Sequence, residues 1–287
     1  MDERKWLAER FEEQRPRLRA VAYRMLGSLS EAEDAVQEAW LRLSGTTYGE
    51  LDDLGAWLTT VVARISLNML RSRKMRSETR VPDPIIDRAD GTSPEHEALL
   101  ANTIGLALLV VLETLAPAER VAFVLHDIFG MPFEEIAPIV ERTPDAARQL
   151  ASRARRRVQA RNATPDADLE VQRSVVDAFL AAAHDGDFSR LVAVLDPDVV
   201  LRGEASAGRL IELRGAEQVA RQAQTFSRLG LLRRPVLVNG AAGAICMLEG
   251  KPFSVMAFTV RGGKIVEVDI LRDPERLSQL DLTALDG

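Results

Sequence analysis

The chain has 287 residues, of which 46% are hydrophobic and 28% charged, and its formal net charge is −6. This length predicts about two domains, and the composition is that of an ordinary globular protein able to bury sizeable cores. The net negative charge argues against a protein that coats nucleic acid indiscriminately. The basic residues are instead concentrated in residues 64–80 and 142–161, which favours docking on DNA at defined surfaces.

Cysteine usage and hydropathy indicate the cellular setting. The single cysteine, Cys246, excludes an internal disulfide framework and indicates a reducing compartment. The charged, amphipathic start of the chain lacks a signal-peptide pattern, and the longest apolar run, Ile104 to Leu112, is too short to cross a bilayer. No His/Cys cluster suggests a metal, and no glycine-rich loop suggests a phosphate. We therefore expect a cytoplasmic protein with no membrane contact, no metal and no cofactor.

Residues 1–76 predict three amphipathic helices. The first ends at a turn at residues 27–29, and Ser30 with Glu33 forms a capping box that begins the second. After a polar loop, Ser44 to Asp53, a third helix begins near Leu54 and becomes basic toward its end. The predicted buried stripes of the second and third helices are Ala35, Val36, Ala39, Trp40 and Leu43, and Trp57, Leu58, Val61, Val62, Ile65 and Met69.

Residues 77–102 are rich in proline and acidic residues and predict an extended linker. Its aspartates Asp83, Asp87 and Asp90 are explained equally well by solubility, by proximity to the basic helices or by a positive channel in a partner.

Within residues 103–162, the stretch 117–161 predicts a helix-turn-helix. Thr143 can cap the second helix and Pro144 suits its first position. The preceding turn has Glu141 or Arg142 where glycine is usual, and Pro138 predicts a kink or a shortened first helix. The two helices offer one core their apolar residues, which are Ile136, Ala137, Ile139 and Val140, and Ala147, Leu150, Ala154 and Val158.

The second of these helices carries a one-signed basic face, opposed only by Asp145. A solvated face is the usual interpretation of such a run, but arginine of a single sign favours DNA contact. Because the second helix of this motif enters the major groove N-terminus first, we expect Arg148 and Gln149 at base edges. The full set predicted at DNA is Thr143, Arg148, Gln149, Ser152, Arg153, Arg155, Arg156 and Arg157, the last four at phosphates.

Residues 163–168 predict a second linker, and residues 169–287 mix helical and strand patterns in an order typical of an α+β domain. The turn Gly262-Gly263 predicts a hairpin, and Cys246 is expected to be a buried strand residue. The predicted helices are 171–184, 187–195 and 215–229, and the predicted strands are 199–202, 234–239, 244–248, 254–260 and 264–271.

Three segments in a characteristic order carry a family resemblance. DAVQEAWLRL (34–43) resembles a signature of bacterial sigma factors, and GAWLTTVVARISLNMLRSRKMR (55–76) resembles the next helix of their extracytoplasmic-function group. The helix-turn-helix is similar to that group's promoter-binding fourth region. The resemblance implies a non-catalytic subunit that binds core RNA polymerase and recognises −35 and −10 promoter elements. Its partners would be core RNA polymerase and both double-stranded and melted promoter DNA.

The same resemblance implies roles for individual positions. Asp34, Gln37 and Glu38 match the segment that docks on the polymerase, and an acidic helix face suits a basic partner, although a solvated face is the alternative. The positions matching the −10 element contacts are Tyr48, Arg64, Asn68, Arg71, Arg73 and Lys74. Positive charge and a stacking aromatic suit a melted strand and its extruded base.

The C-terminal pattern resembles the SnoaL-like, cone-shaped α+β fold, which a subfamily of these sigma factors carries as an extension. That subfamily's linker motif is approximated by residues 80–84, and a glycine-rich turn by Asn239-Gly240. The resemblance implies a multidomain chain: an all-α, three-helix region 2, an all-α region 4, and an α+β cone domain that regulates them by intramolecular contact. The late motif matches Asp273, Pro274, Glu275, Arg276 and Leu277.

Two other functions compete with this one. The first rival is a stand-alone helix-turn-helix regulator with a ligand-sensing cone domain. The second is a cone-fold enzyme, because this fold hosts catalysts that use a carboxylate or histidine base in an apolar cavity. No second catalytic group stands beside any of the candidates, so we do not expect an enzyme. The candidates are His184, Asp196, Asp198, Glu267 and Asp269.

Overall fold

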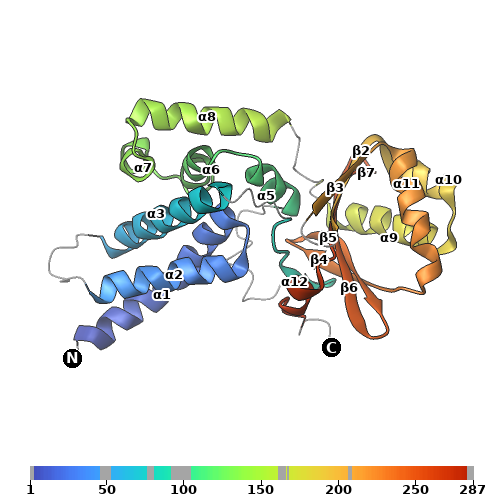
Figure 1. Cartoon of the computed structure of the whole chain (residues 1–287), viewed down its shortest axis with the longest axis horizontal. Helices are drawn as coiled ribbons and strands as arrows, with labels where there is room; N and C mark the ends of the chain where they lie inside the picture. The colour runs from blue at the N-terminus through green and yellow to red at the C-terminus, as the bar shows by residue number, and fades with distance from the viewer. Residues whose placement is uncertain are drawn as a thin grey trace. The chain divides into compact units, whose positions relative to one another are not determined.

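Figure 1 shows the computed structural model of the chain, which describes residues 3–45, 53–75, 81–91, 105–160, 166, 168–205 and 209–282. The described residues fall into two compact units. The first comprises those of Met1–Glu78 and Val111–Asn162, and the second comprises those of Thr79–His96, Thr103–Val110 and Ala163–Gly287.

Three helices form the N-terminal part of the first unit: α1 (Glu3–Leu26), α2 (Leu29–Ser44) and α3 (Leu54–Met75). Each packs on the other two (Figure 1). Gly27, at φ 65°, ends α1, and Ser28 then caps α2 by accepting a hydrogen bond from the Glu31 backbone at 3.5 Å. The predicted capping box is therefore wrong, and Glu33 pairs instead with Arg15 at 2.5 Å.

The second part of this unit contains the helix-turn-helix. Helix α5 (Leu106–Glu113) is divided between the two units after Val110, and it is followed in the first unit by α6 (Pro117–Phe123), a π-helical turn (Val124–Ile128), α7 (Phe133–Val140) and α8 (Pro144–Ala160). Helix α8 packs on both α6 and α7. Its buried residues are all small, which permits close approach of the helices; they are Ala147, Ala151 and Ala154, whereas Leu150 and Val158 are only half-buried.

The turn between α7 and α8 has the left-handed backbone geometry usually taken by glycine, although the sequence places Glu141 or Arg142 there. Glu141 lies in the left-handed region, at φ 57° and ψ 48°, a conformation that costs a side-chain-bearing residue about 1 kcal/mol. The predicted kink or shortening of the helix at Pro138 is wrong, because α7 continues unbroken through Pro138 to Val140. Pro138 and Glu134, whose carbonyl would otherwise accept the missing hydrogen bond, are both exposed, so water can satisfy that carbonyl.

The second unit is an α+β domain. In the described residues its strands form one sheet in the order β1-β4-β5-β6-β7-β2-β3. The β2–β7 pair is parallel and all the other neighbours are antiparallel. The strands are β1 (Ile86–Arg88), β2 (Leu195–Ala205), β3 (Arg209–Arg214), β4 (Leu232–Val238), β5 (Ala241–Leu248), β6 (Lys251–Arg261) and β7 (Lys264–Leu271).

Three helices of this unit gather on one face of the sheet: α9 (Leu169–Asp185), α10 (Phe188–Val194) and α11 (Ala216–Thr225) (Figure 1). The core lies between them and the strands, where Phe179 of α9 meets Phe258 of β6 edge to face at 5.4 Å. The predicted hairpin at Gly262-Gly263 joins β6 to β7, and Cys246 is a buried residue of β5, both as expected. A short helix, α12 (Pro274–Ser278), follows the last strand.

Strand β1 corrects the linker prediction. Residues 81–91 belong to the C-terminal unit, and Ile86 pairs with Val238 of β4. Buried Asn239, at φ 50°, exchanges two hydrogen bonds with the backbone of Ile85: its N–H donates to the carbonyl at 2.9 Å and its side-chain oxygen accepts from the N–H at 3.1 Å. A three-residue strand between prolines gives no period-2 signal. Its pairing with a strand about 150 positions later therefore could not be predicted from the sequence.

Candidate nucleic-acid interface

The N-terminal turn of α8 presents polar side chains to solvent. The Thr143 hydroxyl accepts a hydrogen bond from the Ala146 backbone at 3.3 Å, and the helix begins at Pro144, so both cap predictions are confirmed. Arg148 and Gln149 are exposed on the next turn. The Arg148 guanidinium lies 5.2 Å from the Phe133 ring centroid and donates to Asp145 at 2.6 Å. The planar guanidinium of Arg148 is therefore supported by the ring of Phe133 and remains accessible to a ligand.

Two arginines of the predicted DNA set instead bind an interior carboxylate. Glu119 of α6 is buried and accepts hydrogen bonds from Arg153 at 2.8 Å and Arg157 at 3.0 Å. Burial raises the pKa of this carboxyl, but the hydrogen bond from Arg153 and the charge of Arg157 outweigh it, so its pKa lies below the usual range. Both guanidiniums are about half exposed and attach α8 to α6.

The remaining side chains of the predicted DNA set differ in their exposure and in whether they form an ion pair. Arg155 pairs with Asp127 at 2.6 Å, and Ser152 is half-buried. Arg156 is exposed and makes no ion pair with any residue in the described part of the chain. Within the described part of the chain, the members of this set that make no ion pair are Thr143, Gln149, Ser152 and Arg156, and of these Gln149 and Arg156 are the exposed side chains beyond the helix cap.

The basic end of α3 divides into exposed and interior residues. Arg64, Asn68 and Lys74 are exposed, and Arg71 pairs with Glu141 at 3.2 Å. Tyr48 and most of its loop lie outside the described residues.

Arg73 does not belong with this surface, which corrects the prediction that it faces DNA. Its side chain is 6% exposed; it donates to the Leu26 carbonyl at 2.9 Å and pairs with Glu31. It also lies 3.7 Å from Glu113, which in turn binds Arg120 at 2.8 Å. Because a guanidinium has five N–H donors, one buried arginine can join a helix end and two carboxylates. The period of α3 alone could not reveal these partners, which come from other helices.

The predicted docking residues share the outer side of α2. Asp34 and Gln37 are exposed, and half-exposed Glu38 accepts a hydrogen bond from Arg42 at 2.9 Å. The buried residues of the same helix, such as Ala35 and Ala39, point to the other side. This face is consequently available to a partner.

Comparisons with known proteins agree with this layout. Residues 10–76 match Sigma-70 region 2, and residues 105–158 match Sigma-70 region 4. The chain is 37% identical to the ECF RNA polymerase sigma factor SigJ of Mycobacterium tuberculosis, over 93% of this chain and 92% of that protein. The chain belongs to the extracytoplasmic-function RNA polymerase sigma factors. It therefore directs transcription initiation, and its partners are RNA polymerase and promoter DNA.

Two further comparisons extend over nearly the whole length of this sigma factor. The probable sigma factor SigI of the same species is 34% identical, with 91% of each chain covered. The crystal structure of Mycobacterium tuberculosis SigJ superposes with a TM-score of 0.77 at 36% identity, covering 96% of this chain and 100% of that one. The C-terminal α+β domain is thus part of the shared architecture.

The C-terminal motif of this sigma factor contacts the segment between its two sigma regions. Asp273 caps α12, and Leu277 anchors the helix in the domain. Arg276 donates to the Val81 carbonyl at 2.6 Å and pairs with Asp83. Two motifs that are almost 200 positions apart in the sequence are therefore joined within one domain.

The catalytic candidates of the cone domain do not converge. Glu267 and Asp269 are buried and both pair with Arg202, at 3.0 and 3.3 Å. Burial opposes the charge of Arg202, yet the two carboxylates raise its pKa above the usual value. His184 lies at the end of α9, and Asp196 forms a local turn by accepting from the Asp198 backbone at 2.9 Å.

Among the residues described, no group of His, Cys, Asp and Glu side chains is arranged to hold a metal ion. No described helix has the length and apolar character that crossing a membrane requires.

Proposed function

We propose that this sigma factor recognises the −35 element with the first turns of α8. The observation that carries the proposal is the exposed pair Arg148 and Gln149 just after the N-terminal cap, on the part of a second helix that enters the major groove. Arginine reads guanine bidentately and glutamine reads adenine. Arg155 and Arg156 would contact phosphates, whereas Arg153 and Arg157 act mainly by fixing α8 through Glu119.

The proposal assigns the other contacts to the three-helix region. Asp34, Gln37 and Glu38 would dock on the polymerase by complementary charge. Arg64, Asn68, Arg71 and Lys74, with Tyr48 in the preceding loop, would hold melted −10 DNA, whose negative strand needs cations and whose extruded base needs a stacking partner. The protein would act in the cytoplasm, where its polymerase and promoter are.

We further propose that the cone domain regulates and does not catalyse. Arg276 and Asn239 bind residues 81–85, which belong to the segment between the two sigma regions. The domain would therefore determine how many residues of that segment are free to extend. The carboxylates that could serve as a base, Glu267 and Asp269, are neutralised by Arg202. A base held in an ion pair is poorly placed to accept a substrate proton.

Run-off transcription tests the proposal. Core RNA polymerase is mixed with the full chain on a template carrying the gene's own upstream region, and transcripts are expected only when the chain is present. No transcript, and no co-purification with core polymerase, would refute it.

The regulatory part needs variants, because removing residues after 168 would strip β1 of its sheet and expose Ile85 and Ile86. Arg276→Gln keeps the domain but loses the pair with Asp83, and Arg261→Gln, on the far end of β6, is the matched control. We expect the first to change promoter-directed transcript yield and the second to leave it unchanged. Equal yields for both would remove the regulatory role.

A further inference from the structure

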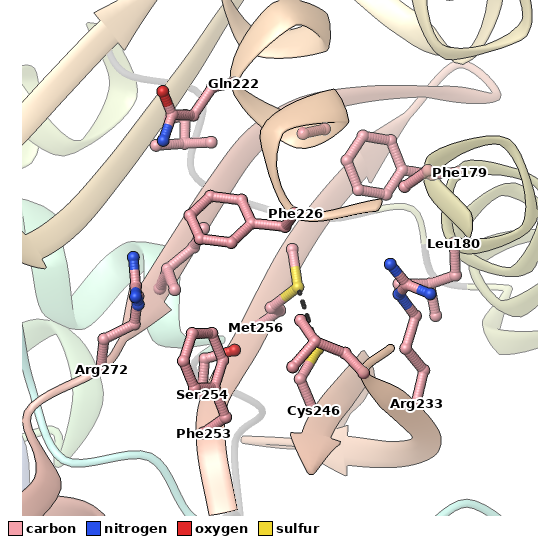
Figure 2. Close-up of a pocket in the computed structure, with 15 residues that line it drawn as sticks. Phe179, Leu180, Gln222, Phe226, Arg233, Cys246, Phe253, Ser254, Met256 and Arg272 are labelled. Atoms are coloured by element: carbon pink, nitrogen blue, oxygen red, sulfur yellow. Dashed lines mark hydrogen bonds between the residues drawn. The ribbon is translucent and has the colours of Figure 1, made fainter. Parts of the chain in front are cut away.

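A narrow pocket opens into the cone domain between α9, α11 and the strands β5 and β6. It encloses about 540 Å³ not occupied by protein atoms, a figure that includes solvent at its mouth. Its wall is almost entirely apolar, as the side chains of Phe179, Met256 and Cys246 in Figure 2 illustrate. The Arg202 cluster does not line it.

Two arginines line this pocket, and no acidic side chain does. Figure 2 shows Arg272 and Arg233 on opposite sides, with Met256 and Cys246 between them. Neither arginine forms an ion pair with a residue in the described ranges. A half-buried cation beside an apolar wall and without a counter-ion is costly, and an anion entering the pocket would relieve that cost.

The surroundings of Arg272 orient it for such an anion. Its guanidinium carbon lies 4.9 Å from the Phe226 ring centroid and 4.7 Å from that of Phe253. A guanidinium held against aromatic rings can still donate from its N–H edge, and the paired N–H groups of that edge match the two oxygens of a carboxylate. Half-buried Arg233 has the exposed His184 ring nitrogen at 3.2 Å as its polar neighbour.

We propose that the cone domain binds an amphipathic monocarboxylate, with its apolar body among Phe179, Leu180 and Met256 and its carboxylate on Arg272 or Arg233. The apolar wall accounts for the body, and the two unpaired cations account for a single negative head group. This inference concerns the cone domain alone and does not depend on the promoter contacts proposed above.

Calorimetric titration of the full chain with decanoate, decanol and decyltrimethylammonium separates head group from body. We expect decanoate to bind about tenfold or more tightly than decanol, the effect of a charge-assisted hydrogen bond, and the cation to bind most weakly. Equal affinities of decanoate and decanol, or no binding of decanoate, would overturn the proposal.

Substitutions then locate the head group. Arg272→Gln and Arg233→Gln are tested singly and together, because either residue can take the carboxylate. The double variant should lose the preference for decanoate while retaining weak decanol binding, which also shows that the pocket has folded. Arg228→Gln, an exposed arginine that does not line the pocket, is the matched control and should bind as the unsubstituted chain does. A decanoate preference that survives the double substitution would overturn the proposal.

The only cysteine of the chain supplies an independent readout inside the pocket. Burial raises the pKa of Cys246, against the opposing effects of Ser254 and Arg233, so its thiol should react slowly with a small maleimide. Decanoate bound in the pocket should slow that reaction further, and the double arginine variant should not show this protection. An unchanged rate for the unsubstituted chain at saturating decanoate would place the ligand elsewhere and overturn the assignment.

Discussion

Glu119 connects a local charge balance to the placement of the recognition helix. The carboxyl is buried, yet two arginines of α8 keep its pKa below the usual range. Since the folded value lies below that of the unfolded chain, about 4.3, the interaction stabilises the fold above that pH. This contribution is lost as the pH falls through the lower, folded value. Acid should therefore loosen α8 from α6.

Replacing Glu119 by Gln should remove this pH dependence. At neutral pH we expect α8 to lose about 1–3 kcal/mol of local stability, because two hydrogen bonds to a buried charge are weakened. Hydrogen exchange of α8 peptides in the full chain, measured from pH 7 down to about pH 2.5 so that the scan passes below the unfolded pKa of about 4.3, reports the local free energy. Glu134→Gln, an exposed acid of α7, serves as the control. A variant with the same protection and the same pH slope as the parent would contradict the explanation.

Arg148 is the residue at which specificity should be measurable. Arg148→Ala should weaken recognition of the −35 element by about 1–3 kcal/mol and relax the preference at one base pair, because a bidentate contact to guanine is lost. Arg156→Ala, at an exposed residue of the same helix, should instead weaken binding to all sequences alike. Holoenzyme binding to a set of promoters substituted at single −35 positions measures both effects. An unchanged preference for Arg148→Ala would assign this residue to phosphate contact.

Strand β1 depends on one side chain of the β4–β5 turn. Asn239 adopts a left-handed conformation that glycine also tolerates, and its amide oxygen accepts from Ile85. Asn239→Gly should therefore keep the turn but lose that hydrogen bond. We expect residues 85–88 to exchange amide hydrogens faster, with a local cost of about 1–2 kcal/mol, while β5 and β6 keep their protection. Loss of protection across the whole sheet would mean that the turn itself had failed.

The elements that the sequence predicted well are those with a long internal period. Helices α2, α3 and α9 and the β6–β7 hairpin follow from apolar stripes and turn residues. Strand β1 has three residues and a distant partner, so it could not be found from a local pattern. Strand β3, which pairs with the neighbouring β2, was missed as well. The candidate site likewise has parts that the sequence could predict and parts that it could not. The exposure of Arg148 follows from helical spacing. The hydrogen bonds of Arg153 and Arg157 could not be predicted in this way, because their acceptor, Glu119, lies on another helix. Pro138 was misjudged because exposure, not sequence, determines what its missing N–H costs.

At the scale of the first unit, the two sigma regions are packed together. Helix α3 contacts both α6 and α7, and Arg71 pairs with Glu141 of the helix-turn-helix turn. Positions −35 and −10 of a promoter are about 25 base pairs apart, roughly 85 Å of duplex at about 3.4 Å per base pair. A compact unit of this size measures on the order of 40 Å across. The two regions must therefore separate before both elements can be contacted.

This separation should be visible as a loss of energy transfer. Donor and acceptor dyes are placed on Glu9→Cys in α1 and Gln159→Cys in α8, both exposed positions, in a Cys246→Ser background. Transfer should be efficient in the free protein and fall when core RNA polymerase and promoter DNA are added. Dyes on Glu134→Cys and Gln159→Cys, which lie within the helix-turn-helix region, should show no change. The contact between Arg71 and Glu141 is a surface ion pair worth about 0–1 kcal/mol, so its loss is no barrier to opening. Transfer that stays high in a complex making transcripts would mean that one element is read without region 4 leaving region 2.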